Sequence, residues 1–255
     1  SKFKSTRKIF NNYKKNINHL KKTPRDIIVL CENYNKYYFC IPFDKNVINE
    51  NAKHHICGID QGVRTFATTY SPNDGYKEFG HKLWYNVEPL EHKIDNLKSM
   101  LDNHINKTIK LSYNTRKHMW RRCDLLRTKV KNIVRDFHWK TATYLVKNYQ
   151  YIVLPAFNTK QMVNKMSRNI SSYTVRAMMA QSHYKFKEKL IYKASCYRNR
   201  YIITEGDEIL TTKRCGNCGG IDNHIKANKI YNCMNCRYEE GRDRNAARNI
   251  LIQNT

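Results

Sequence analysis

Two pairs of cysteines near the end of the chain constrain its fold more than any other feature. The stretch CGNCGGIDNHIKANKIYNCMNC places Cys215 and Cys218 in one C-x2-C pair and Cys233 and Cys236 in a second, with 14 residues between the pairs. Two residues between thiolates let one turn present both sulfurs to a single ion, and two such turns complete a tetrahedral site. Four thiolates leave no open position on the metal. We therefore expect a structural zinc ion in a small ribbon, without a catalytic role.

The chain also carries a large excess of positive charge. It has 255 residues, with 47 Lys and Arg against 21 Asp and Glu, and a formal net charge of +26. Aromatic rings lie among the basic residues in SYNTRKHMWRR, where rings can stack on bases while charged groups meet phosphates. We expect a nucleic-acid partner, contacted in this stretch by Arg116, Lys117, Arg121 and Arg122.

The sequence predicts neither secretion nor a membrane partner. No run approaches the roughly 20 apolar residues of a membrane span, and no signal peptide is visible. Nine cysteines without a secretion signal indicate a reducing compartment. We expect an intracellular protein, placed in the nucleus if it comes from a eukaryote or its virus and otherwise in the cytoplasm.

Strand patterns dominate the first part of the chain after a basic segment, residues 1–24, that we expect to be helical. DIIVLCENYNKYYFCIPF (Asp26–Phe43) alternates around a turn and predicts a β-hairpin. HICGIDQGVRTFATTYSPNDG (His55–Gly75) predicts two strands joined by a tight turn, and YKEFGHKL a third.

A helical period follows. Leu90, Ile94, Leu97 and Leu101 form one apolar stripe, and a second stripe runs from Met119 to Phe137, so we expect two antiparallel helices. A strand at Ile152–Leu154, a helix from Tyr173 to Ser195, a strand at Tyr201–Glu208 and a last short helix, RDRNAARNILI, complete the predicted elements. Strands alternating with helices after a meander predict an α/β domain with a mixed sheet.

Two acidic residues lie at positions that favour a site. Asp60 ends an apolar strand in GIDQGV, and Asp243 falls in the first turn of the last helix. Each also has an ordinary structural explanation, Asp60 as a turn-former and Asp243 as a helix cap.

The chain resembles the RuvC-like nuclease domain of transposon-encoded TnpB and of its eukaryotic and viral relatives, the Fanzor proteins, which are related to type V CRISPR effectors. The residues that carry the resemblance run from about Ile56 to the C-terminus: GIDQGVRTF, DFHWKTATYLV, YIVLPAF, EILTTKRCGNCG and NCMNCRYEEGRDRNAARNIL.

The resemblance implies an RNase H-like fold that cuts DNA with two Mg²⁺ ions, held by Asp60, Asp243 and a third acid. It also implies a domain order. We expect an N-terminal, wedge-like nucleic-acid-binding region that ends within residues 1–50 and is truncated, since the chain starts at Ser1. A RuvC-like domain at 51–208 with a helical hairpin insertion at 88–148, a zinc ribbon at 209–240 and a final helix at 241–255 follow.

The third acid is missing from its usual place. In TnpB the strand matching Ile152–Leu154 ends in Glu, whereas here Pro155-Ala156 follows. In the Fanzor proteins Pro replaces that Glu, and a Glu seven residues before the first zinc cysteine takes over, which corresponds to Glu208. Glu205 and Asp207 are nearby competitors, and a solvent-exposed Glu208 is the structural alternative.

The resemblance implies an RNA-guided DNA endonuclease of a mobile element that works with guide RNA and target DNA as a monomeric ribonucleoprotein. Arg242 and Arg244 are expected to contact DNA, although salt bridges are their common alternative. Two other interpretations stay open. One is a guide-dependent DNA-binding protein that has lost cleavage, and the other is a DDE-type transposase, which fits the position of the ribbon poorly.

Overall fold

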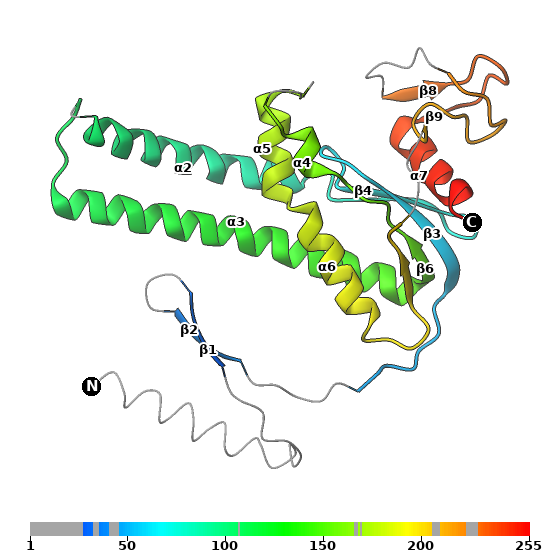
Figure 1. The fold of residues 1–255 in the computed structure, drawn as a ribbon, viewed down its shortest axis with the longest axis horizontal. Helices are drawn as coiled ribbons and strands as arrows, with labels where there is room; N and C mark the ends of the chain where they lie inside the picture. Colours follow the sequence, from blue (N-terminus) through cyan, green and yellow to red (C-terminus); the bar gives the residue numbers. More distant parts are fainter. Residues whose placement is uncertain are drawn as a thin grey trace. The chain divides into compact units, whose positions relative to one another are not determined.

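The computed structural model describes residues 28–32, 36–40, 46–106, 108–165, 168, 170–205, 210–222 and 229–255. The chain forms two units, residues 1–46 and residues 47–255 (Figure 1). Within the first unit, β1 (Ile28–Glu32) and β2 (Lys36–Cys40) pair antiparallel, with Val29 opposite Phe39. This confirms the predicted hairpin. The helix expected over residues 1–24 lies outside the described residues.

The second unit is built on one five-stranded sheet in the order β5-β4-β3-β6-β7. The neighbours β5, β4 and β3 pair antiparallel, whereas β3, β6 and β7 run parallel. The strands are β3 (His54–Gln61), β4 (Ala67–Ser71), β5 (Gly75–Phe79), β6 (Tyr149–Val153) and β7 (Tyr201–Ile203). The predicted mixed sheet is therefore confirmed.

Two long antiparallel helices, α2 (Leu83–Ile105) and α3 (Tyr113–Asn148), form the predicted helical hairpin (Figure 1). The hairpin begins earlier than expected, because Leu83, Trp84 and Val87 extend the buried stripe of α2 by two turns. Ser112 caps α3 by accepting a hydrogen bond from the Thr115 N–H at 3.1 Å.

The single helix expected from Tyr173 to Ser195 is wrong. The structure has two helices, α5 (Ser172–Gln181) and α6 (His183–Ala194), separated by Ser182 in the left-handed conformation at φ 51°. The break lets the side chains on either side of it turn inward. Gln181 donates from Nε2 to the carbonyl of Val63 at 2.7 Å, and this tertiary contact compensates for the backbone strain.

The main core lies on the sheet face that α2, α3 and α6 cover, where Cys57, Ile59 and Ile152 are fully buried. Successive side chains of a strand point to opposite faces, so Gly58 and Asp60 face the other side of the sheet. There, α7 (Arg242–Gln253) packs through Ile250 and Leu251.

The remaining described elements are short: α4 (Thr159–Met162), β8 (Ile230–Asn232) and β9 (Glu239–Gly241). β8 and β9 pair antiparallel in the ribbon that precedes α7. The strand predicted to run to Glu208 ends at Ile203, and residues 206–209 lie outside the described part. Of the helices described, none combines the length and the apolar character that a membrane span requires.

Candidate active site

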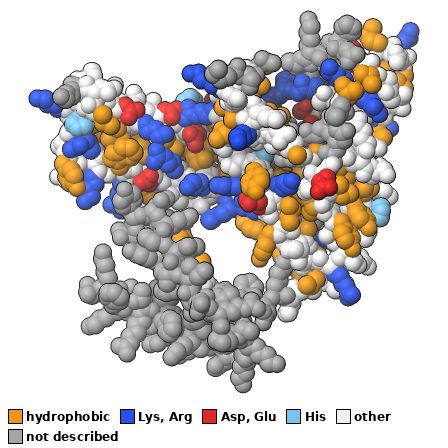
Figure 2. Space-filling view, in the orientation of Figure 1, with side chains coloured by type: hydrophobic (Ala, Val, Ile, Leu, Met, Phe, Trp, Pro, Cys, Tyr) orange, Lys and Arg blue, Asp and Glu red, His pale blue; other side chains and the backbone are white. Residues whose placement is uncertain are grey.

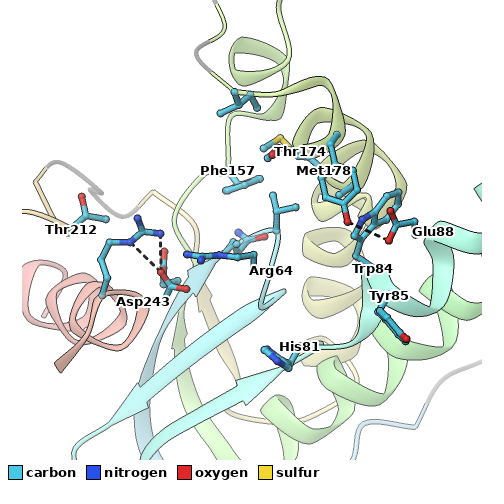
Figure 3. A pocket seen from close by; sticks show the side chains of 18 residues that line it. Arg64, His81, Trp84, Tyr85, Glu88, Phe157, Thr174, Met178, Thr212 and Asp243 are labelled. Atoms are coloured by element: carbon cyan, nitrogen blue, oxygen red, sulfur yellow. Dashed lines mark hydrogen bonds and ion pairs between the residues drawn. The ribbon is translucent and has the colours of Figure 1, made fainter. Parts of the chain in front are cut away.

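A cavity of about 630 Å³ opens where β3 ends, between the β3–β4 turn, α2, α5 and the start of α7 (Figure 3). Both Asp60 and Asp243 line it, although they come from the first strand of the sheet and the last helix of the chain. The other residues that form its wall are Gln61, Gly62, Val63, Arg64, His81, Trp84, Tyr85, Glu88, Phe157, Ile170, Tyr173, Thr174, Ala177, Met178, Thr212 and Arg242.

A close approach between α7 and β3 places the two acids at the same end of the sheet. A Cβ atom at Gly58 would lie 2.7 Å from the carbonyl oxygen of Ala247 and 2.9 Å from the amide of Leu251. Only glycine leaves room for the helix backbone at this distance. Asp60 lies two residues beyond Gly58 on the same face, and Asp243 lies one turn before Ala247.

The arginines at the start of α7 are engaged in ion pairs. The Arg242 guanidinium lies 3.2 Å from Oδ1 of Asp243, so a positive charge sits beside this carboxylate within the cavity wall. Arg244 contacts Glu78 at 3.0 Å and Glu240 at 3.7 Å. For both residues the structure therefore contains the salt bridges that the sequence left as the alternative to DNA contacts.

The four ribbon cysteines converge, as predicted from their spacing. All four Sγ atoms lie within 4.8 Å of one another, with the pairs Cys215–Cys236 and Cys218–Cys233 at 3.7 Å and 3.6 Å. Zn–S bonds of about 2.3 Å in a tetrahedron place neighbouring sulfurs about 3.8 Å apart. The cysteines could therefore hold a zinc ion with little movement.

Two buried asparagines of α7 join this helix to the ribbon. Asn245 accepts from the Gly216 N–H at 2.8 Å and donates to the carbonyl of Arg214 at 2.8 Å. Asn249 donates to the carbonyls of Thr211 and Arg214, each at 2.7 Å. Both side chains are at most 1% exposed, so these bonds hold the helix that carries Asp243 against the ribbon segment around Cys215.

The end of β6 has a structural role. Pro155 is buried, and its carbonyl accepts a hydrogen bond from Nε2 of Gln61 at 3.4 Å. Ala156 is exposed and offers no ligand atom. Glu205 is exposed and is not among the described residues that line the cavity. Glu208 and Asp207 lie outside the described residues, so the third acid stays a prediction.

Two buried histidines pack beside the β3–β4 turn. Nδ1 of His183 lies 3.2 Å from Oε1 of Gln61, and its ring stacks on Phe66 with the centroids 4.5 Å apart. His138 meets the carbonyl of Gln181 at 2.9 Å through Nε2. Burial lowers the pKa of His183 to about 3 and that of His138 to about 4. Both rings are therefore neutral at physiological pH.

The basic stretch predicted to bind nucleic acid lies at the start of α3. Lys117, Arg121 and Arg122 are exposed and Arg116 is half-buried. Figure 2 shows Lys and Arg side chains distributed along the visible face of the second unit. The structure thus leaves this surface available, and its contacts with nucleic acid stay a prediction.

Sequence reasoning missed most of the cavity wall beyond the two aspartates. Arg64, Tyr85, Phe157 and Tyr173 come from a turn, two helices and a loop, and no spacing in the sequence connects them. Arg64 had one available signal, since it lies four residues after Asp60 within the motif GIDQGVR.

Comparison with known proteins assigns the family. A family model described as a probable transposase matches residues 40–166, and a model described as Cas12f1-like, TNB domain, matches residues 183–250. The chain is 30% identical over 217 residues to TnpB-like protein L79 of Acanthamoeba polyphaga mimivirus. The match covers 85% of this chain and 40% of that protein. The chain belongs to the TnpB family.

Further matches agree with the TnpB family. The chain is 32% identical over 130 residues to the CRISPR-associated endodeoxyribonuclease Cas12f1 of Sulfoacidibacillus thermotolerans, covering 51% of this chain and 29% of that one. The fold is similar to that of the Cas12f1-sgRNA-target DNA complex structure, with a TM-score of 0.55 and 15% identity over 80% of this chain and 40% of that one. The chain therefore spans less than half the length of these relatives. Membership of the Fanzor branch stays a prediction.

Proposed function

We propose that this chain carries the nuclease centre of an RNA-guided DNA endonuclease of a mobile element. The observation that carries the proposal is that Asp60, at the carboxyl end of β3, and Asp243, at the start of α7, line one cavity. The TnpB family and the endodeoxyribonuclease name of one relative support DNA as the substrate.

The chemistry follows from the side chains available. Asp60 and Asp243, with Glu208 as the third acid, would hold two Mg²⁺ ions through carboxylate oxygens, the ligands that this ion prefers. Such a pair of ions supplies a nucleophilic water and stabilises the leaving oxygen in phosphodiester hydrolysis. Arg242 lines the same cavity, where it pairs with Asp243, and it would also bind a phosphate oxygen of the strand. The zinc ion of the ribbon would be structural, since its four thiolates leave no open position.

The proposed partners are a guide RNA and a target DNA, in a monomeric ribonucleoprotein. A solved structure of similar fold is described as a Cas12f1 complex with sgRNA and target DNA. The net charge of +26 agrees with nucleic-acid partners. Guide pairing would supply sequence specificity, with the protein contacting mainly the backbone.

The test is Mg²⁺-dependent cleavage of single-stranded DNA by the protein purified with its RNA. Asp60→Asn and Asp243→Asn should each lower the cleavage rate by at least a hundredfold, since each removes a metal ligand. Asp136→Asn is the matched control, because this exposed aspartate of α3 pairs with Lys140 and does not line the cavity. Glu208→Gln should match the two aspartate variants, and Glu205→Gln should match the control.

Each contrary result has a defined meaning. Loss of activity in Glu205→Gln but not in Glu208→Gln would transfer the third role to Glu205. Wild-type protein that binds target DNA and never cuts it would refute the nuclease and favour the DNA-binding alternative, in which Pro155-Ala156 marks a lost acid.

A further inference from the structure

We propose that the aromatic half of the cavity, between α2 and α5, is a base-stacking subsite. It would hold a nucleotide next to the scissile phosphate of a single-stranded DNA, with Tyr173 and Tyr85 as the stacking rings and Arg64 on the connecting phosphate. The proposal rests on the proposed nuclease function, since it takes the two aspartates as the position of the scissile bond.

Tyr173 is an exposed ring that its neighbours hold in place. Its hydroxyl donates to Oε2 of Glu88 at 3.2 Å, and its ring meets Trp84 edge-on with the centroids 5.8 Å apart. The side chain is nevertheless 54% exposed, and Tyr85 on the neighbouring helix is 75% exposed. A ring that its neighbours already hold in place loses little conformational entropy when a base stacks on it.

Ion pairs keep the two helices that carry these rings together. Arg176 of α5 contacts Glu91 of α2 at 3.2 Å and also contacts Asp95 of the same helix. These contacts begin one turn beyond Tyr173, so they fix its position opposite Trp84 and Glu88. The aromatic wall, formed by Trp84, Tyr85 and Tyr173, therefore lies between two helices that ion pairs hold together.

Arg64 connects the aromatic wall to the acids. In Figure 3 its side chain extends from the β3–β4 turn toward Asp243, and Phe157 lies above it, while Trp84, Tyr85 and Glu88 lie on the opposite side. Arg64 is exposed and forms no ion pair with any residue that the structure describes, in contrast to Arg242 and Arg244. An arginine without a carboxylate partner inside a cavity is a ready ligand for phosphate.

Size and chemistry together indicate one strand and not a duplex. The cavity of about 630 Å³ falls in the range of roughly 300–1,000 Å³ that holds a single small ligand. Aromatic rings beside an arginine that pairs with no described carboxylate suit an unstacked base and its phosphate, whereas a base stacked inside a duplex would present no free face to them. We commit to DNA because the proposed reaction cuts DNA.

The test measures binding separately from cleavage. The 255-residue chain with Asp60→Asn and Asp243→Asn is titrated, without Mg²⁺, against single-stranded DNA oligonucleotides that carry one 2-aminopurine at successive positions. We expect one position whose fluorescence is quenched on binding. Tyr173→Leu and Tyr85→Leu, added in turn, should abolish this quenching and raise the Kd roughly fivefold to a hundredfold, the range for loss of one stacked base.

Matched variants separate stacking from charge and from misfolding. Tyr173→Phe keeps the ring and should change the Kd by less than about threefold. Tyr184→Leu removes a ring of α6 that is 71% exposed and lies outside the cavity wall, and it should bind as the parent does. Arg64→Gln should lower the slope of log K against log salt by about 0.7, the value for one phosphate contact on a single strand.

Several outcomes would overturn the subsite. One is that Tyr173→Leu and Tyr85→Leu show the same Kd and the same quenching as Tyr184→Leu. Another is that the chain binds RNA of the same sequence more tightly than it binds the DNA. Failure of the proposed nuclease function would give another result. The wild type would then not cut DNA, although one oligonucleotide position would still be quenched on binding and Tyr173→Leu would still abolish that quenching. A wild type that cuts while both tyrosine variants cut and bind normally would refute the subsite alone.

Discussion

The two buried histidines predict that the fold loses stability as pH falls below about 6.5. His138 and His183 are 1% and 2% exposed, and burial lowers their pKa values to about 4 and about 3 from the ordinary 6.5. Because the folded pKa is depressed, the unfolded chain binds the protons first. The stabilising contribution is complete above pH 6.5 and is lost as pH falls toward the folded pKa values.

The size of this loss follows from the shifts. A pH of about 5.5 lies one unit below the unfolded pKa and still above both folded values. At this pH each histidine lowers the unfolding free energy by about 1.4 kcal/mol, or about 2.8 kcal/mol for the pair. His183→Phe keeps an aromatic ring between Phe66 and Phe157 but removes the titrating group. It should halve this contribution to the fall in unfolding free energy between pH of about 7.5 and 5.5.

The assay is urea unfolding followed by tryptophan fluorescence at several pH values. Cysteine protonation in the ribbon contributes equally to wild type and variant, so the difference between their pH slopes isolates His183. His118→Asn is the control, since this exposed histidine of α3 meets water in the folded and the unfolded chain alike. Equal pH slopes for wild type and His183→Phe would refute the reasoning, as would a wild type that gains stability on acidification.

Three further predictions concern the attachment of α7. Gly58→Ala should lower the unfolding free energy by about 1–3 kcal/mol, because its Cβ would lie 2.7 Å from the Ala247 carbonyl, and it should also lower cleavage. Asn249→Ala removes the donor to Thr211 and Arg214 and should cost about 1–3 kcal/mol in urea unfolding, whereas an unchanged midpoint would contradict this bonding role. Removing zinc with a chelator should lower the melting temperature and expose the ribbon to protease, and zinc should restore both.

The sequence predicted structure best where a local pattern of residues determines it. The spacing of Cys215, Cys218, Cys233 and Cys236 predicted a cluster, and the structure has it. The apolar stripes predicted the helical hairpin, because a stripe depends only on which face of a helix is buried.

Tertiary contacts decided what the local pattern could not. The sequence predicted one helix from Tyr173 to Ser195, whereas the chain breaks at Ser182, next to the bond from Gln181 to the Val63 carbonyl. The aromatic wall escaped prediction for the same reason. Tyr173 and Arg64 come to line one cavity only through the packing of α5 on α2 and the path of the β3–β4 turn.

The separation of the two aspartates along the chain has a consequence for synthesis. Asp60 lies on the first strand of the sheet, and Asp243 lies on α7, after the ribbon has been made. A nascent polypeptide emerging from the ribosome can therefore form the meander and the helical hairpin while it holds only one of the two carboxylates. A product of premature termination before α7 would be a protein with most of its sheet and without Asp243. Such a fragment would lack one of the two carboxylates on which the proposed cleavage depends.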